Sequence, residues 1–183
     1  MSDKFSKFVS KFKWFWPWQD EIEEKWLREM SLRGYHLLGF RWPGFYHFLK
    51  GEPKNYVYRL DYKEDFDRNI EEYLELFNQS GWEYIGRYMM WRYFRTEASG
   101  DKLPDIYSDS ASKINRNKKI LGLSVIGVIA LLSAGFMNIR IYLFSCGEKM
   151  NLYVGLLDTI LGIIFIPGTL KVIGRNNKLK KEI

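Results

Sequence analysis

Two long apolar runs near the C-terminal end dominate the hydropathy pattern of this 183-residue chain. Residues 120–139 contain no charged residue, and residues 152–170 contain only Asp158. A helix of either length is about 30 Å long, the thickness of the hydrocarbon core of a bilayer. Because backbone in lipid must form its own hydrogen bonds, the pattern predicts a transmembrane helical hairpin over residues 120–173, followed by a basic tail over residues 174–183.

Basic residues flank the hairpin and set its expected orientation. Short segments rich in Lys and Arg stay cytoplasmic. Such residues lie on both flanks, at Lys113, Arg116, Lys118, Lys119, Lys171, Arg175, Lys178, Lys180 and Lys181. We therefore expect a multi-pass cell-membrane protein with two helices, both termini cytoplasmic and the connector outside. The alternative, a buried hairpin in a soluble protein, is disfavoured because matched basic flanks around such apolar runs rarely occur in a soluble core.

The chain before residue 97 alternates between helical and strand periodicity. A helix is expected over residues 20–33, with acidic residues in its first turn and an apolar stripe formed by Ile22, Trp26, Leu27 and Met30. Strands are expected over residues 35–42 and 45–51, around a type II turn at Pro43-Gly44, and over residues 55–63. A second helix over residues 67–80 precedes strands at 82–88 and 90–96. Gly34 and Gly81 are expected to end the two helices in the left-handed conformation.

The first 18 residues combine two periodicities. Phe5, Phe8, Val9 and Phe12 fit one face of a helix, whereas alternate aromatic residues from Phe12 to Trp18 fit a strand. We expect an amphipathic lead segment over residues 1–10 and a strand over residues 11–16. A helix lying in the membrane interface is the alternative.

The chain also resembles itself at an offset of 47 residues. Trp26, Leu27, Met30, Gly34, Tyr35, Leu38 and Gly39 correspond to Tyr73, Leu74, Phe77, Gly81, Trp82, Ile85 and Gly86. This pattern predicts two strand–helix–strand–strand units, at residues 11–50 and 54–96. Together they would form an α+β domain over residues 11–96, with helices on one side of antiparallel sheet. A polar linker follows over residues 97–119, in which Asp109 can cap a helix that continues into the first apolar run.

Charge is divided unevenly along the chain. Residues 1–110 contain 17 Lys and Arg against 19 Asp and Glu, and residues 111–183 contain 11 against 3. The basic residues therefore belong mainly to the membrane flanks, where they would meet anionic lipid. The domain lacks the basic face of a nucleic-acid-binding protein. The single cysteine, Cys146, excludes an intramolecular disulfide and a cysteine-rich metal site, but it could pair between chains.

Catalytic and metal-binding patterns are not recognised in the sequence. His36 and His47 lie on two strands of one hairpin, but no further ligands with metal-site spacing accompany them. The acidic cluster at Asp20, Glu21, Glu23 and Glu24 is explained by its position at a helix start. No phosphate loop, nucleophile elbow or His-Glu-x-x-His pattern is present. We therefore expect no catalytic residues, no metal, no cofactor and no enzymatic activity.

Two sets of residues are the candidates for function. The first is an aromatic pocket between sheet and helices, for which a plain hydrophobic core is the alternative, formed by Trp14, Trp26, Tyr35, Tyr58, Trp82 and Trp91. The second is Asp158, because an acid within a transmembrane segment is costly. Ser133 and Arg140 are the expected contacts of Asp158 on the other helix, where small residues would allow close approach, at Ala130, Ala134, Gly155 and Gly162. A structural polar contact or access to water is the alternative role for Asp158.

A family resemblance rests on paired motifs in the domain. The segments EEKWLREMSLRGYHLLGF, FYHFLKGEPKNYVYRLDY and EYLELFNQSGWEYIGRYMMWRYF, followed by DIYSDSASK, resemble the bacterial family catalogued as domain of unknown function 2812. The resemblance covers residues 12–118 and is carried by the Trp-Leu…Gly-Tyr and Tyr-Leu…Gly-Trp elements. It implies a membrane-anchored cytoplasmic domain, often encoded beside PadR-like transcriptional regulators. It provides no catalytic residues.

These patterns favour a membrane-anchored cytoplasmic module that binds or regulates a partner without catalysis. The expected partners are the lipid bilayer and a membrane protein or regulator, and not nucleic acid. The alternative function is a small transport or immunity accessory that acts through the hairpin and Asp158.

Overall fold

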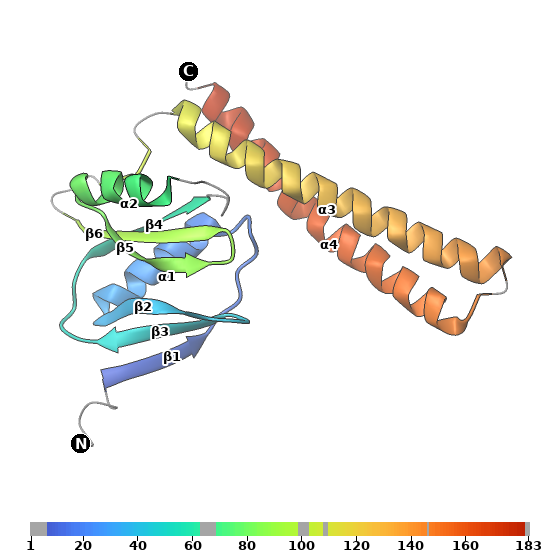
Figure 1. The fold of residues 1–183 in the computed structure, drawn as a ribbon, viewed down its shortest axis with the longest axis horizontal. Helices are drawn as coiled ribbons and strands as arrows, with labels where there is room; N and C mark the ends of the chain where they lie inside the picture. The colour runs from blue at the N-terminus through green and yellow to red at the C-terminus, as the bar shows by residue number, and fades with distance from the viewer. Residues whose placement is uncertain (1–6, 63–68, 99–102, 108–109, 146, 182–183) are drawn as a thin grey trace. The chain divides into compact units, whose positions relative to one another are not determined.

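The computed structural model describes residues 7–62, 69–98, 103–107, 110–145 and 147–181. The chain forms two compact units that divide between Ser108 and Asp109. The first unit is α+β, and the second is a pair of long helices (Figure 1).

The α+β unit repeats one order of elements. Its first half consists of β1 (Phe8–Phe12), α1 (Asp20–Leu32), β2 (Tyr35–Arg41) and β3 (Phe45–Lys50). Its second half consists of β4 (Tyr56–Tyr62), α2 (Ile70–Gln79), β5 (Glu83–Tyr88) and β6 (Trp91–Glu97). Each half therefore has the expected strand–helix–strand–strand order, so the predicted duplicated arrangement is confirmed.

Each half forms its own antiparallel sheet of three strands. The strand orders, β1-β3-β2 and β4-β6-β5, are equivalent. The strand after each helix contains an irregularity in register, between Leu37 and Gly39 in β2 and between Tyr84 and Gly86 in β5. These positions are 47 residues apart, which is the offset of the sequence match. The halves thus share a bulge in addition to their strand order.

Helix α1 and two hydrogen bonds join the sheets into one domain. The backbone N–H of Leu37 in β2 donates to the Tyr58 hydroxyl in β4, and Arg95 in β6 donates to the Leu37 carbonyl. Helix α1 contacts both β2 and β4, and it lies behind both sheets in Figure 1. The core contains fully buried aromatic and aliphatic side chains from both halves, including Leu27, Leu37, Phe48, Val57, Tyr58, Leu60, Tyr93 and Phe94.

Glycine ends both helices of this unit as predicted. Gly34 follows α1 with φ +78° and Gly81 follows α2 with φ +82°. After α2, the Gly81 N–H donates to the Asn78 carbonyl and the Trp82 N–H donates to the Phe77 carbonyl, both at 2.9 Å. This is the Schellman arrangement, and it turns the chain directly into β5.

Several local expectations are wrong. The first strand spans Phe8–Phe12 and not residues 11–16, because it pairs with β3 from Phe8↔Leu49 to Phe12↔Phe45. The β2–β3 turn is closed by the Gly44 N–H on the Arg41 carbonyl, with a cis Trp42–Pro43 peptide, so it is not a type II turn at Pro43-Gly44.

The buried face of α1 also differs from the expected stripe. Leu27 and Met30 are buried, but Ile22 is 46% exposed, and its predicted place is taken by Asp20 and Glu23. At the start of this helix, hydrogen bonds between acidic side chains and the sheets, and not the apolar stripe, determine which face is buried.

The second unit consists of α3 (Ser110–Phe144) and α4 (Lys149–Lys180). Both helices are long and apolar enough to span a membrane, and only 17% and 22% of their apolar segments is buried. Helix α3 continues through the basic run at residues 113–119, as expected. Asp109, the expected cap, and Cys146 lie outside the described residues.

The two helices run antiparallel (Figure 1), and small residues lie where they meet. A Cβ on Gly135 would contact the Thr159 hydroxyl, and it would lie 2.9 Å from the Gly155 carbonyl. A Cβ on Gly162 would lie 2.8 Å from the Leu132 side chain. Large apolar side chains are instead exposed on the outside, including Ile126, Ile129, Phe136, Leu143, Leu157, Ile160 and Ile163. Small residues inside and large ones outside are typical of helices that pack in lipid.

Candidate functional site

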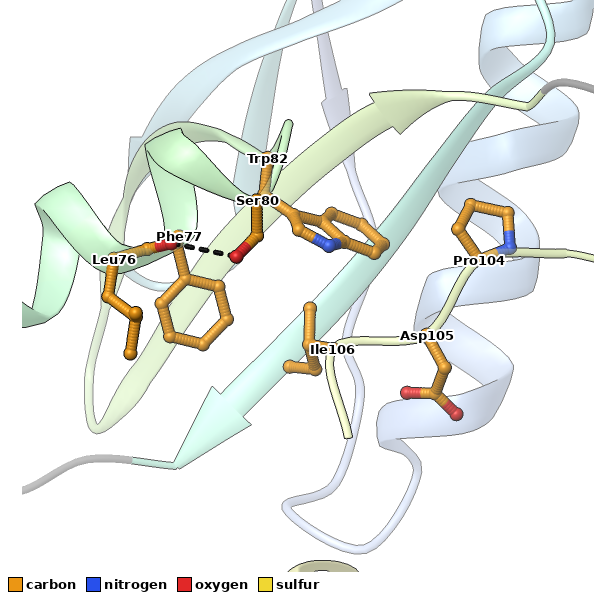
Figure 2. Close-up of a pocket in the computed structure, with 7 residues that line it drawn as sticks. All are labelled: Leu76, Phe77, Ser80, Trp82, Pro104, Asp105 and Ile106. Carbon is orange, nitrogen blue, oxygen red and sulfur yellow. Dashed lines mark hydrogen bonds between the residues drawn. The ribbon is translucent and has the colours of Figure 1, made fainter. Parts of the chain in front are cut away.

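A groove opens beside α2 in the second half of the α+β unit. It encloses about 460 Å³ and is lined by Leu76, Phe77, Ser80, Trp82, Pro104, Asp105 and Ile106. Figure 2 shows Phe77 from α2 and the Trp82 indole on one side, with residues 104–106 crossing opposite them. Apolar side chains with a few polar groups, at this volume, are typical of a small-molecule site.

The floor of the groove belongs to a small hydrophobic core. Val57, Trp82 and Phe94 are buried there, and Phe77 and Ile106 pack against them. The Phe77 and Phe94 rings stack with centroids 4.3 Å apart. The helix cap explains why Trp82 lies at the groove, because the Trp82 N–H is bound to the Phe77 carbonyl one turn back. The helix cap therefore sets the position of Trp82 in the α2–β5 wall of the groove.

The opposite wall is an extended segment, residues 103–107, which we call the strap. Contacts from three neighbouring residues of the strap, among those that the structure describes, hold it to the sheet. Ile106 packs into the small core, Asp105 lies 3.8 Å from Arg59 of β4, and the Tyr107 hydroxyl donates to Asp61. The strap precedes α3 directly in the sequence, with only residues 108 and 109 between them.

Asp61 is the polar anchor of this wall. It is 7% exposed and accepts hydrogen bonds from the Tyr107 hydroxyl on Oδ1 and from the Tyr73 hydroxyl of α2 on Oδ2, the latter at 2.5 Å. Burial, followed by the negative charge of Asp61, raises the pKa of Tyr73 above its ordinary value of 10, so Tyr73 remains a donor. One carboxylate therefore binds both walls of the groove, α2 and the strap.

A second buried carboxylate joins α1 to both sheets. Glu23 is 5% exposed, and one of its oxygens accepts hydrogen bonds from Tyr46 of β3 and Tyr93 of β6, each at 2.6 Å. Burial raises the pKa of Glu23 from 4.5 to about 7, against the lowering effect of these two hydrogen bonds. Burial and the Glu23 charge also raise the pKa of Tyr46 and of Tyr93.

The acidic cluster at the start of α1 therefore also joins this helix to the sheets. Besides Glu23, Glu24 accepts a hydrogen bond from the Leu60 N–H at 2.8 Å and pairs with Arg59 at 3.3 Å. The expectation that the helix dipole fully accounts for these acids is wrong. The missed signal is the spacing of Glu23 with Leu27 and Met30, which places the carboxyl on the buried face of α1.

The six aromatic residues expected to line a pocket are dispersed through the unit. Only Trp82 lines the groove. Tyr58 is fully buried between the halves, and Trp26 packs on Tyr46 with ring centroids 5.0 Å apart. The other three lie elsewhere: Trp14 is 51% exposed, Tyr35 lies beneath Lys11, and Trp91 packs on Tyr62. Periodicity identified large rings but could not show which of them share a surface.

The two histidines occupy different environments. His36 is fixed by its two ring nitrogens, which lie 2.9 Å from the Ser31 hydroxyl and 2.8 Å from the Glu52 carbonyl. His47 lies half-buried on β3, opposite Gly39. Within the described residues, no group of three or more His, Cys, Asp and Glu side chains could hold a metal ion.

The hairpin residues are placed as follows. Asp158 is half-buried beside Thr159, at the border of the helix–helix seam. Ser133 and Arg140 are exposed in the isolated hairpin. Gly155 and Gly162 lie in the seam, as expected, together with Gly135, whereas Ala130 and Ala134 are exposed. The seam residue Gly135 was missed because a single small residue within a long apolar run has no distinguishing pattern.

Comparison with known proteins identifies the family of the chain. The model of the family described as "Protein of unknown function (DUF2812)" matches residues 19–130, which include both buried carboxylates, the groove, the strap and the start of α3. No curated protein and no solved structure matches the chain. Because the match covers more than half of the sequence, the chain belongs to the DUF2812 family.

Proposed function

We propose that this protein is a membrane-anchored binding module, without catalytic activity, in which the groove beside α2 takes a small ligand. The observation that carries the proposal is the strap: it forms one wall of the groove and leads directly into α3. A ligand that changes the contacts of residues 104–106 would change the constraint on the start of a helix long enough to span a membrane.

The lining indicates the chemistry of the ligand. Leu76, Phe77, Trp82 and Ile106 offer an apolar and aromatic surface, and the Asp105 carboxylate supplies a negative charge at one end. Asp105 lies 3.8 Å from Arg59 and accepts a hydrogen bond from the Tyr107 N–H at 3.2 Å. The groove therefore favours a small aromatic or aliphatic molecule that carries a cation or a hydrogen-bond donor.

Ligand-observed NMR on the purified full chain tests the proposal. Tryptamine serves as a cationic aromatic probe and 3-indolepropionate as its anionic counterpart. Tryptamine is expected to bind more tightly than the anion, and Leu76→Glu is expected to increase the difference, because a second acid in the groove attracts the cation and repels the anion. Asn78→Glu makes a comparable change on the exposed face of α2 and should behave as wild type. Equal, weak binding of both probes to all three proteins would contradict the proposal.

The bilayer is the first partner in this proposal, and a membrane protein or regulator is the second. The two apolar helices would anchor the module, with both chain ends cytoplasmic, because the basic residues lie at that end of each helix. The small-residue seam and the large apolar exterior support this location.

A second candidate function rests on the position of Asp158. This acid lies next to the seam residue Thr159, within the segment that would cross the membrane. A transport or immunity accessory acting through the hairpin would need that carboxylate. Activity of such an accessory would be lost in Asp158→Asn and retained in Asp105→Asn, whereas the binding module predicts the opposite.

A further inference from the structure

The α+β unit exposes large apolar side chains at one end, around the β2–β3 turn, the β5–β6 turn and the end of β1. Trp42 is 75% exposed and Met89 is 65% exposed. We call the whole set the tip surface; its members are Phe12, Trp14, Trp42, Phe45, Met89 and Met90. A contiguous exposed apolar patch marks a site of contact with a protein or a membrane.

Ring contacts within the unit place these residues at the same end. The Phe12 and Phe45 rings lie 5.2 Å apart and join β1 to the β2–β3 turn, against which the Trp14 ring also lies. Close to the two turns, Phe40 of β2 and Tyr88 of β5 have ring centroids 5.6 Å apart. Figure 1 shows both turns and the end of β1 on the same side of the unit.

The β5–β6 turn places a methionine where the backbone favours a smaller residue. Met89 has φ +55°, the left-handed conformation for which hairpin turns use glycine or asparagine. Because its side chain is largely exposed, Met89 returns little packing to the unit for this backbone cost. Strained positions of this kind occur where a residue serves a function outside the fold.

The charge beside the tip surface is positive on the side of β1, β2 and β3. Residues 7–18 and 34–51 contain no Asp or Glu, but they contain Lys7, Lys11, Lys13, Arg41 and Lys50. The Lys13 ammonium lies 4.7 Å from the centre of the Trp26 ring, a neutral partner that leaves its charge in place. Arg41 is exposed at the turn itself. Tryptophan beside Lys and Arg is typical of segments that lie in a membrane interface, where the cations complement anionic lipid.

The chain also continues toward the membrane helices from this end of the unit. The Tyr107 hydroxyl donates to Asp61, whose neighbour Tyr62 donates to Met90 Sδ at 2.8 Å. Helix α3 begins three residues after Tyr107, at Ser110. The point at which the unit is joined to its membrane anchor therefore lies at the same end as the tip surface.

We propose that the tip surface docks on an anionic bilayer. Trp14, Trp42 and Met89 insert at the level of the headgroups, and Lys13 and Arg41 lie beside the lipid phosphates. The proposal rests on the membrane anchor of the proposed function, and it does not depend on the groove or its ligand.

Fluorescence quenching on the full chain in phosphatidylglycerol nanodiscs tests the proposal. A bimane label is attached through Met89→Cys in a Cys146→Ser background, and the nanodiscs carry a lipid with a nitroxide high on its acyl chain. Ile126→Cys, on the exposed exterior of α3, is the positive reference, and Glu75→Cys, on the exposed face of α2, is the negative reference. We expect quenching at positions 89 and 126 and not at position 75.

The other outcomes overturn the docking and identify what has failed. Quenching at position 126 alone would refute the docking and leave the anchor in place, whereas quenching at none of the three positions would refute both. Equal quenching at positions 89 and 75 would mean that the unit has no preferred face. Shielding of position 89 from an aqueous quencher that increases with protein concentration in detergent would assign the tip surface to a second copy of the chain.

Matched variants separate the apolar and the charged contributions. Trp42→Ser should reduce quenching at position 89 to the level of position 75, whereas Leu32→Ser, at an exposed position at the far end of α1, should not. Arg41→Gln should lower the ratio of docked to free unit about fivefold, the effect of one basic residue at an anionic surface. Lys50→Gln, exposed at the other end of the β2–β3 hairpin, is the control. Equal effects within either pair of variants would overturn the proposal.

Discussion

Glu23 is the residue at which buried charge and fold stability are most directly linked. Its pKa in the folded chain, about 7, lies above its ordinary value of 4.5, because burial disfavours the charged form. The folded state therefore binds more protons than the unfolded state between these two values. The Glu23 contribution to stability is fully present below pH 4.5 and is lost as pH rises to 7.

We predict that unfolding of the α+β unit becomes easier by about 3 kcal/mol between pH 4.5 and pH 7, the linkage for a shift of this size. Chemical denaturation of the full chain, followed by tryptophan fluorescence, measures this, because all seven tryptophans lie before residue 92. Glu23→Gln should remove this part of the pH dependence. Glu29→Gln, on the exposed face of α1, is the control. A slope unchanged in Glu23→Gln would contradict the pKa shift.

The two helix-ending glycines should differ in their tolerance of a side chain. At Gly81 a Cβ meets open space, so Gly81→Ala is expected to cost only the left-handed backbone penalty, about 1 kcal/mol. At Gly34 a Cβ would clash with the Gly51 carbonyl, so Gly34→Ala should destabilise the unit further. The same denaturation assay ranks the two variants. A larger cost at Gly81 would refute the reasoning.

At the scale of elements, the strap is the part whose attachment can be tested alone. Tyr107→Phe removes the hydroxyl that binds Asp61 and leaves the ring in place. We predict that maleimide alkylates a cysteine introduced by Ile106→Cys faster in the Tyr107→Phe background. Without the Tyr107 hydroxyl, the side chain at position 106 would leave the core more often. The assay uses Cys146→Ser to remove the native thiol. Tyr56→Phe, on the same unit but away from the strap, should leave the rate unchanged.

The helix pair gives a second prediction at this scale. Replacing Gly135 with Ile would place a branched side chain against Thr159 and the Gly155 carbonyl, where a single Cβ already meets close contacts. We predict that Gly135→Ile separates the helices and lowers the melting temperature of the hairpin, followed by circular dichroism in detergent. Gly127→Ile, at which a Cβ meets nothing within 4 Å, is the matched control. Equal melting of the two variants would mean that the seam is misplaced.

For the whole molecule, orientation in the membrane is the expectation to test. Reporter fusions after Glu97 and at the C-terminus should both report cytoplasm, and a fusion near Glu148 should report the outside. The reason is that most basic residues lie just before the first apolar run and just after the second. An outside signal from either terminal fusion would refute the orientation.

Sequence patterns predicted the molecule best where they are long or repeated. The helix at Asp20–Leu32, the two glycine ends, the strand–helix–strand–strand order along each half and the two long apolar helices all follow from periodicity and spacing. Contacts between residues far apart in the sequence could not be predicted in this way. Glu23 meets Tyr93 across 70 positions and Tyr107 meets Asp61 across 46, and only the folded chain brings them together. The groove was missed for the same reason, because a segment assigned to a linker forms one of its walls.

The duplicated halves differ in how firmly their helices are held. Helix α1 buries five residues, including Leu27 and Met30, whereas α2 buries none completely. Segments with little buried surface open at a lower free energy than the rest of a domain. Amide hydrogens in α2 should therefore exchange with solvent through a local opening, while those of α1 exchange only when the whole unit unfolds. One copy of the motif would thus supply stability, and the other would be left free to fluctuate beside the groove.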